Sequence, residues 1–212
     1  MKKMMAIVAL FATLTGYTQN AKYEAAMKKN LQQLDSAKTT LQFQAVAASF
    51  ERIGDAEKTQ WLPYYYAGLA MLSPGWQDAN LDKDANGERV KALCDKADAL
   101  AKDNADKAEI LSLRNMVATQ QMLVDPQTRF MTYGQESDRY LKKGIELNGS
   151  NPRLYYLQGA GIFGTPEQFG GGKAKAKPIL QKSVELYKTE TAKPLYPNWG
   201  KKEAEDMLAQ CQ

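Results

Sequence analysis

Apolar residues recur at spacings of three and four positions along most of the chain, which is the pattern of amphipathic helices. Runs that alternate between apolar and polar residues are few, so the pattern predicts no strands. Stretches rich in Gly, Pro, Asn and Asp interrupt the helical spacing and mark turns. The sequence therefore predicts an all-α fold. Its helices are expected over residues 21–34, 38–54, 57–72, 88–102, 105–123, 135–148, 151–163, 172–188 and 199–210.

A large residue recurs near the start of every second predicted helix from residue 57 onward, at intervals of 46, 45 and 44 residues. Four positions after the first and the third of these residues lies a glycine, Gly68 or Gly159. A glycine on a packing face lets a neighbouring helix approach closely. A regular interval of this length indicates a helical-repeat protein. The four large residues are Tyr64, Ile110, Tyr155 and Trp199.

The helices between these positions share a second pattern. Each carries a stripe with spacings of four, three and three, in which the third position is a small residue. A helix presents such positions on one face, so each stripe predicts a packing surface. The three stripes are Val90, Cys94, Ala97 and Leu100; Ser137, Leu141, Gly144 and Leu147; and Ala176, Leu180, Ser183 and Leu186.

Together these patterns resemble the tetratricopeptide repeat (TPR) family, and the best match covers residues 137–162. The chain departs from the family at Arg114 and Glu203, where a glycine is expected. Its period also exceeds the family's usual value of about 34 residues. The excess falls within the units, at 73–87, 124–134 and 164–171. The resemblance implies a right-handed α-solenoid of antiparallel helix pairs, with three to four units and a C-terminal capping helix.

The N-terminus has the layout of a secretory signal peptide. Met1-Lys2-Lys3 is positively charged, and an apolar stretch over residues 4–14 is followed by small residues at Gly16 and Thr18. That stretch is shorter than the roughly 20 residues a transmembrane helix needs. We therefore expect a leader over residues 1–18, a single domain over 19–212, and an exported protein that is periplasmic or secreted.

Composition excludes several kinds of chemistry. The chain contains no histidine, which excludes His-based triads and most zinc and non-haem iron sites. Its formal charge of +4 includes two lysines of the leader, which is too small an excess to predict nucleic-acid binding. Cys94 lies on a packing stripe and Cys211 at the chain end, so no disulfide between them is expected.

The long connections carry large aromatic residues, the type that dominates binding hot spots. If the units stack, Trp76, Phe130, Tyr133 and Phe169 come to one edge and form a candidate partner-binding surface. The alternative is that these residues fold back and fill gaps between the repeats. Tyr65 and Tyr66 are further candidates, which line the concave groove or fill the seam against the helix at 38–54.

One stretch resembles the first half of a calcium-binding EF-hand loop. Asp82, Asp84 and Asn86 have the spacing of its first ligands, and Gly87 follows them. The acidic ligand that closes such a loop is missing, because Leu93 takes its place. The three residues are a candidate metal site; the alternative is a polar turn that caps the next helix.

Two functions remain open from the sequence. The first is an exported binding or scaffold module for a protein or peptide partner, with no catalysis, no cofactor and no membrane span. The second is a carboxylate-based enzyme or a small-ligand (glycan) binding protein in the same compartment. An enzyme of this kind needs two carboxylates that converge in a cleft, and no such pair is marked by spacing.

Overall fold

The computed structural model describes residues 20–211, and within this range the protein is helical and has no strand. The predicted all-α class is therefore confirmed, whereas the leader predicted over residues 1–18 lies outside the described range. No helix within 20–211 is both long and apolar enough to cross a membrane. An unlabelled first helix covers residues 20–36. It is followed by α2 (Thr40–Glu57), α3 (Leu62–Leu72), η1 (Ser73–Trp76), α4 (Lys83–Asp98), α5 (Asn104–Met122), α6 (Pro126–Arg129), η2 (Phe130–Gly134), α7 (Gln135–Leu147), α8 (Pro152–Gly164), η3 (Glu167–Phe169), α9 (Lys173–Thr189) and α10 (Lys201–Ala209).

Polar side chains fix where the helices begin. Thr39 and Gln42 form a capping box at the start of α2, in which each side chain bonds the other residue's backbone. Asp103 caps α5 by accepting a hydrogen bond from the backbone of Asp106. Asn151 caps α8 directly before Pro152, which occupies a first-turn position where proline is tolerated.

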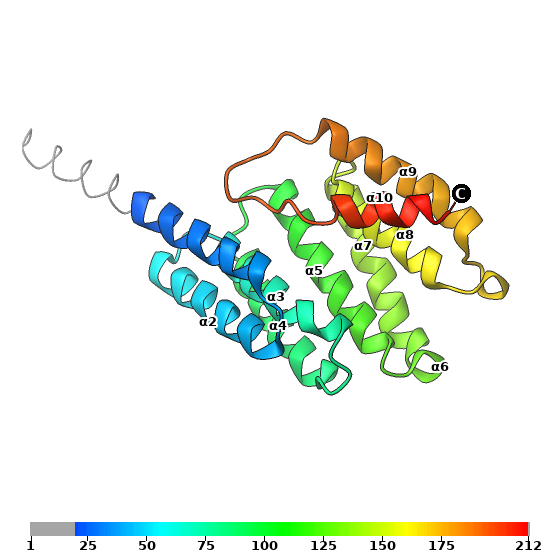
Figure 1. The fold of residues 1–212 in the computed structure, drawn as a ribbon, viewed down its shortest axis with the longest axis horizontal. Coiled ribbons are helices and arrows are strands. Elements are labelled where there is room, and N and C mark those ends of the chain that lie inside the picture. The colour runs from blue at the N-terminus through cyan, green and yellow to red at the C-terminus, as the bar shows by residue number, and fades with distance from the viewer. Residues whose placement is uncertain (1–19, 212) are drawn as a thin grey trace, which may run out of the picture.

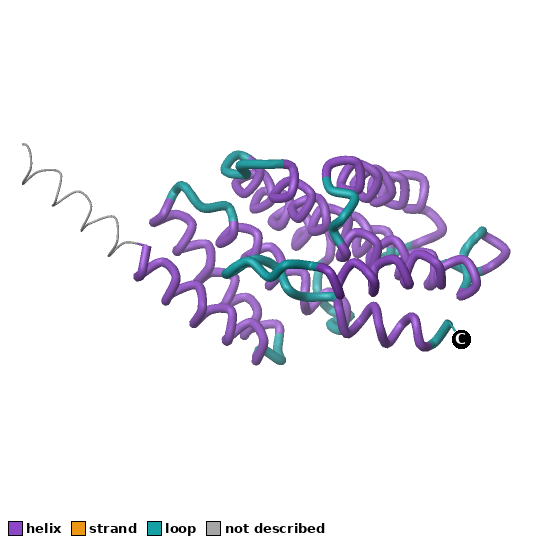
Figure 2. The backbone as a smooth tube through the Cα atoms, turned by 90° about the horizontal axis from the view of Figure 1, so that it is seen from above, coloured by secondary structure: helices purple, strands orange, loops and turns teal. Residues whose placement is uncertain are grey.

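The helices pack mainly against their neighbours in sequence, as Figures 1 and 2 show. A second series of contacts joins α3 to α5, α5 to α8 and α8 to α10. Contacts mainly between sequence neighbours, together with contacts along every second main helix, are expected for stacked helix pairs. The right-handed solenoid and the TPR resemblance stay predictions.

Glycines at the predicted positions allow close helix contacts. A Cβ atom added to Gly159 of α8 would lie 2.6 Å from the Leu180 side chain of α9. A Cβ added to Gly144 of α7 would lie 2.9 Å from Leu154 of α8. Both distances are too short for a real carbon pair, so these helices can pack as they do only because the side chain is missing.

The predicted connection at 124–134 is wrong, because most of it is helical. α6 begins at Pro126, and η2, a π-helical turn, runs directly into α7. Proline in the first turn of a helix costs no hydrogen bond, so the turn signal at Asp125-Pro126 marks a helix start rather than a loop.

A segment at residues 190–200, here called the C-terminal segment, connects α9 to α10 and runs back toward α3 (Figure 1). The Tyr66 hydroxyl donates to the carbonyl of Leu195 at 2.9 Å, and the Trp199 indole donates to the Tyr65 hydroxyl at 2.7 Å. Tyr196 packs edge-on against Trp61, with ring centroids 5.6 Å apart. Through these contacts Leu195, Tyr196 and Trp199 pack against the largest core cluster, which is formed mainly by the N-terminal helices.

Candidate functional site

Six large apolar side chains remain exposed around the ends of α2, α3, α5 and α6. We call this set the apolar edge. Its connections lie along the lower and right side of the molecule in Figure 1. Exposed large apolar groups that gather in one region are typical of binding surfaces. The members of the apolar edge are Leu41, Trp76, Leu123, Val124, Phe130 and Met131, which are between 46% and 78% exposed.

Hydrogen bonds between the supporting elements hold this edge together. The Thr40 hydroxyl, next to Leu41, donates to Asp78 at 2.7 Å and so ties the start of α2 to the segment that follows Trp76. The Gln120 amide donates to the carbonyl of Leu72 at 2.9 Å and ties the end of α5 to the end of α3. Both bonds connect separate elements, so the exposed side chains project from a braced support.

Phe130 and Met131 project from η2. The Phe130 ring lies directly over Gly134, where an added Cβ would be only 2.7 Å from it, and this contact fixes its direction. Tyr133, in the same turn, is half-buried between two cations. Lys91 and Arg129 lie 5.8 and 5.7 Å from its ring centroid. The two cations beside the apolar edge are each paired with a carboxylate, Lys91 with Glu88 and Arg129 with Asp84.

The structure separates the aromatic residues predicted as binding candidates. Trp76 and Phe130 belong to the apolar edge and Tyr133 lies beside them. Phe169 is 74% exposed but stands on η3, in the connection between α8 and α9. The alternative that these side chains fill gaps between repeats is wrong for Trp76, Phe130 and Phe169, which face solvent.

Tyr65 and Tyr66 are not binding-surface residues in this structure, which corrects the groove interpretation. Their side chains are 0% and 2% exposed. Tyr66 stacks on Phe50 of α2 and so fills the seam that was the alternative prediction. Tyr65 is covered by the C-terminal segment through its hydrogen bond with Trp199.

The candidate metal site is also corrected. Asp82 caps α4 by accepting hydrogen bonds from the backbone of Asp84 and Ala85, both at 3.0 Å. The Asp84 carboxylate pairs with Arg129 at 2.7 Å, and the Asn86 amide donates to the carbonyl of Met71. Residues 20–211 contain no group of three or more acidic or cysteine side chains that could hold a metal ion. The stretch is the polar helix cap that was the alternative.

A buried ionic cluster is present that was not among the sites predicted from the sequence. Arg153 of α8 lies between Glu109 of α5 and Glu190 at the end of α9, and it pairs with both. Arg153 and Glu109 are 4% and 5% exposed, and Asn151 donates to Glu109 at 2.8 Å. Burial raises the pKa of the Glu109 carboxyl, although Arg153 opposes this. The sequence did contain a signal for this cluster, because Glu109 is a charged residue directly before the packing position Ile110.

The cluster borders a cavity of about 340 Å³. Two carboxylates do converge there, as the enzyme alternative requires, but Arg153 stands between them and bonds both. A carboxylate engaged in this way is a poor nucleophile or base. The cluster instead links α5, α8 and the C-terminal segment.

Fold and surface together define an all-helical protein that keeps an apolar surface exposed beside basic side chains. No protein-family model and no curated protein matches the chain. Among solved structures, the chain is similar to the HusA haemophore from Porphyromonas gingivalis, with 36% sequence identity and a TM-score of 0.80. The similarity covers 90% of this chain and 92% of the other. The chain therefore belongs to the family of the HusA haemophore.

Proposed function

We propose that the protein is an exported binding protein for haem or a related porphyrin, and that the apolar edge holds this ligand. The observation that carries the proposal is the gathering of Trp76, Phe130 and Met131 on a surface of a haemophore-family chain. The leader expected at residues 1–18 supports export. Haem is here the cargo of the protein, and catalysis has no part in the proposal.

The chemistry of the edge suits this ligand. A porphyrin is a flat, largely apolar ring with carboxylates at its rim. Trp76 and Phe130 supply apolar and aromatic area for the ring. Lys91 and Arg129 beside Tyr133 are paired with Glu88 and Asp84, and the porphyrin carboxylates would compete with these acidic partners for them. The chain has no histidine, so Met131 and Tyr133 are the side chains of this region whose chemistry matches known haem ligands.

The scaffold function predicted from the sequence would use the same exposed aromatics. Family membership favours a small ligand over a protein partner, because the relative named above is a haemophore. We therefore keep the TPR-like solenoid as the proposed architecture and replace the protein partner with a porphyrin as the proposed ligand.

The test is a titration of the purified protein with haemin, followed by absorption in the Soret band. We expect saturable binding by the wild type and at least tenfold weaker binding by the Trp76→Ala, Phe130→Ala double variant, because each aromatic hot spot contributes about 2 kcal/mol or more. Phe169→Ala is the matched control, since it removes an equally exposed aromatic from a different connection, and its Kd should stay within twofold of wild type.

Absence of saturable binding to the wild type would contradict the proposed function. Equal affinity of the wild type and the double variant would leave haem binding intact and place it elsewhere on the molecule.

A further inference from the structure

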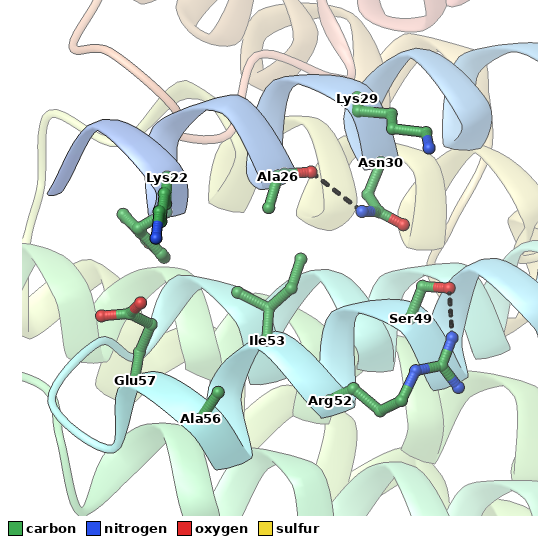
Figure 3. Close-up of a pocket in the computed structure, with 10 residues that line it drawn as sticks. Lys22, Ala26, Lys29, Asn30, Ser49, Arg52, Ile53, Ala56 and Glu57 are labelled. Atoms are coloured by element: carbon green, nitrogen blue, oxygen red, sulfur yellow. Dashed lines mark hydrogen bonds between the residues drawn. The ribbon is translucent and has the colours of Figure 1, made fainter. Parts of the chain in front are cut away.

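A second hollow lies on another part of the molecule, between the helix at 20–36 and α2 (Figure 3). Its volume is about 460 Å³, within the usual range of small-ligand sites. Neither helix carries Trp76, Phe130 or Met131, so this groove is separate from the three residues on which the proposed haem site rests. Its lining combines apolar, basic and amide side chains.

The middle of the groove is apolar and its two ends differ in charge. Ala26, Ile53 and Ala56 occupy the middle in Figure 3. At one end Lys22 faces Glu57, so opposite charges offset each other there. At the other end Lys29 and Arg52 lie with Asn30 and Ser49.

The Lys29–Arg52 end carries uncompensated positive charge. Neither side chain forms an ion pair within residues 20–211, and Arg52 donates only to the Ser49 hydroxyl, at 2.8 Å. Two exposed cations at one end of an apolar groove attract an anion, and they can bind a carboxylate through charge-assisted hydrogen bonds.

Two buried polar atoms of the lining have no hydrogen-bond partner: the Tyr23 hydroxyl and the Asn30 side-chain oxygen. The two residues are only 6% and 8% exposed. The Asn30 amide nitrogen donates to the carbonyl of Ala26 at 2.8 Å, so its oxygen is left as an acceptor that faces no donor. A buried polar group without a partner costs about 1–3 kcal/mol. A ligand that supplies the missing partner would remove this cost.

We propose that this groove binds a medium-chain carboxylic acid that carries a hydroxyl group near its carboxylate. The carboxylate lies between Lys29 and Arg52, the hydroxyl donates to the oxygen of Asn30, and the hydrocarbon chain covers Ala26, Ile53 and Ala56. Lys22 and Lys29 are seven helical residues apart, which corresponds to about 10 Å along the groove. That length suits a chain of the size of decanoate.

Isothermal titration calorimetry with 3-hydroxydecanoate tests the proposal. We expect saturable binding with one site per chain. Decanoate should bind more weakly than 3-hydroxydecanoate because it lacks the donor for Asn30. Decanol should bind at least tenfold more weakly than decanoate because it lacks the charge.

Two variants assign the binding to the groove. Lys29→Gln with Arg52→Gln should weaken 3-hydroxydecanoate binding at least tenfold and abolish the difference between decanoate and decanol. Asn30→Leu should abolish the advantage of the hydroxy acid over decanoate. The control is Lys173→Gln with Lys177→Gln, which removes the same charge at α9 and should bind as the wild type. Urea midpoints of all variants report whether they fold.

Failure of the wild type to bind the acid at millimolar concentration would overturn the proposal, as would unchanged binding in the folded groove variants. The same variants titrated with haemin should bind it as the wild type does. Loss of haemin binding with loss of the acid would contradict two separate sites, whereas loss of haemin binding in the Trp76→Ala, Phe130→Ala variant alone would leave this proposal intact.

Discussion

Arg153 and Glu109 show how a single pair of residues can connect distant parts of the fold. They lie 44 positions apart, and Arg153 also reaches Glu190 at the end of α9. Removing one partner of a buried pair leaves an unpaired buried charge, which typically costs about 3–5 kcal/mol. An exposed pair such as Lys202 and Asp206 contributes little, because water screens the two charges. Loss of one charged partner is therefore far more damaging in this buried cluster than at an exposed pair.

Cys94 makes the stability sensitive to alkaline pH. Burial raises the pKa of its thiol from the usual 9.0 to about 12. Between these values the unfolded chain loses the thiol proton and the folded chain keeps it, so stability falls as the pH rises above 9. We expect the free energy of unfolding to fall by about 1 kcal/mol more in the wild type than in Cys94→Ala between pH 9 and pH 10.

Urea unfolding at fixed pH values measures this difference. Measurements at pH 7 are the control, because the thiol is protonated there in both the folded and the unfolded state. The difference in the free energy of unfolding between wild type and Cys94→Ala at pH 7 therefore reports only the packing lost with the side chain. Parallel pH profiles for the two proteins would contradict a buried, neutral thiol.

At the scale of the helices, two of the three glycines of α8 lie in different surroundings. Gly159 packs against Leu180 of α9, whereas an added Cβ at Gly161 would meet no atom within 4 Å. The same substitution should therefore have opposite effects two residues apart.

We expect Gly159→Ala to destabilise the protein by about 1–3 kcal/mol, because the new methyl group overlaps Leu180. Gly161→Ala should stabilise it by up to about 1 kcal/mol, because alanine is the better helix former at an open position. Thermal or urea unfolding gives both values, and a shift of the same sign in the two variants would contradict the close contact between α8 and α9.

The helices could be predicted from the sequence because their signals are local. Apolar spacing, capping residues and prolines lie within the element that they specify, so most predicted ends lie within a few residues of the observed ones. The stretch at 124–134 was missed because Pro126 and Gly134 are turn signals that a short helix and a π-turn also accommodate.

The surface could be predicted only in part, for a related reason. Exposure of Trp76 and Phe130 was one of two open alternatives, because both lie in short turns where apolar spacing does not decide burial. Burial of Tyr65 depends on its hydrogen bond with Trp199, which lies 134 residues away. The repeat interval marks Trp199 as a packing residue but does not identify Tyr65 as its partner. The groove of Figure 3 is formed where two helices face each other. Apolar spacing within either helix does not predict how the two helices are arranged.

For the molecule as a whole, the C-terminal segment changes how stability is distributed. In an open stack of repeats each unit supports only its neighbours. Here Leu195 and Trp199 bond residues of α3, near the other end of the row. The two ends are thereby joined, and we expect them to unfold together.

The Tyr196→Ala, Trp199→Ala double variant tests this coupling. In the wild type, the urea transitions followed by circular dichroism and by fluorescence of its three tryptophans should coincide. In the variant they should separate, because the N-terminal helices no longer depend on the C-terminal part. Thr191→Ala, at an exposed position of the same segment, is the control and should leave the transitions coincident. Coincident transitions in the double variant would contradict the coupling.

The same contacts set an order of events when the chain is made. Tyr66 emerges from the ribosome 129 residues before its partner Leu195. At the usual synthesis rate of about 5–20 residues per second, this corresponds to roughly 6–26 seconds in which the aromatic cluster of α3 is without its cover. The core of α3 is therefore completed only when almost the whole chain has been synthesised, and until then its aromatic side chains are open to contact with other proteins.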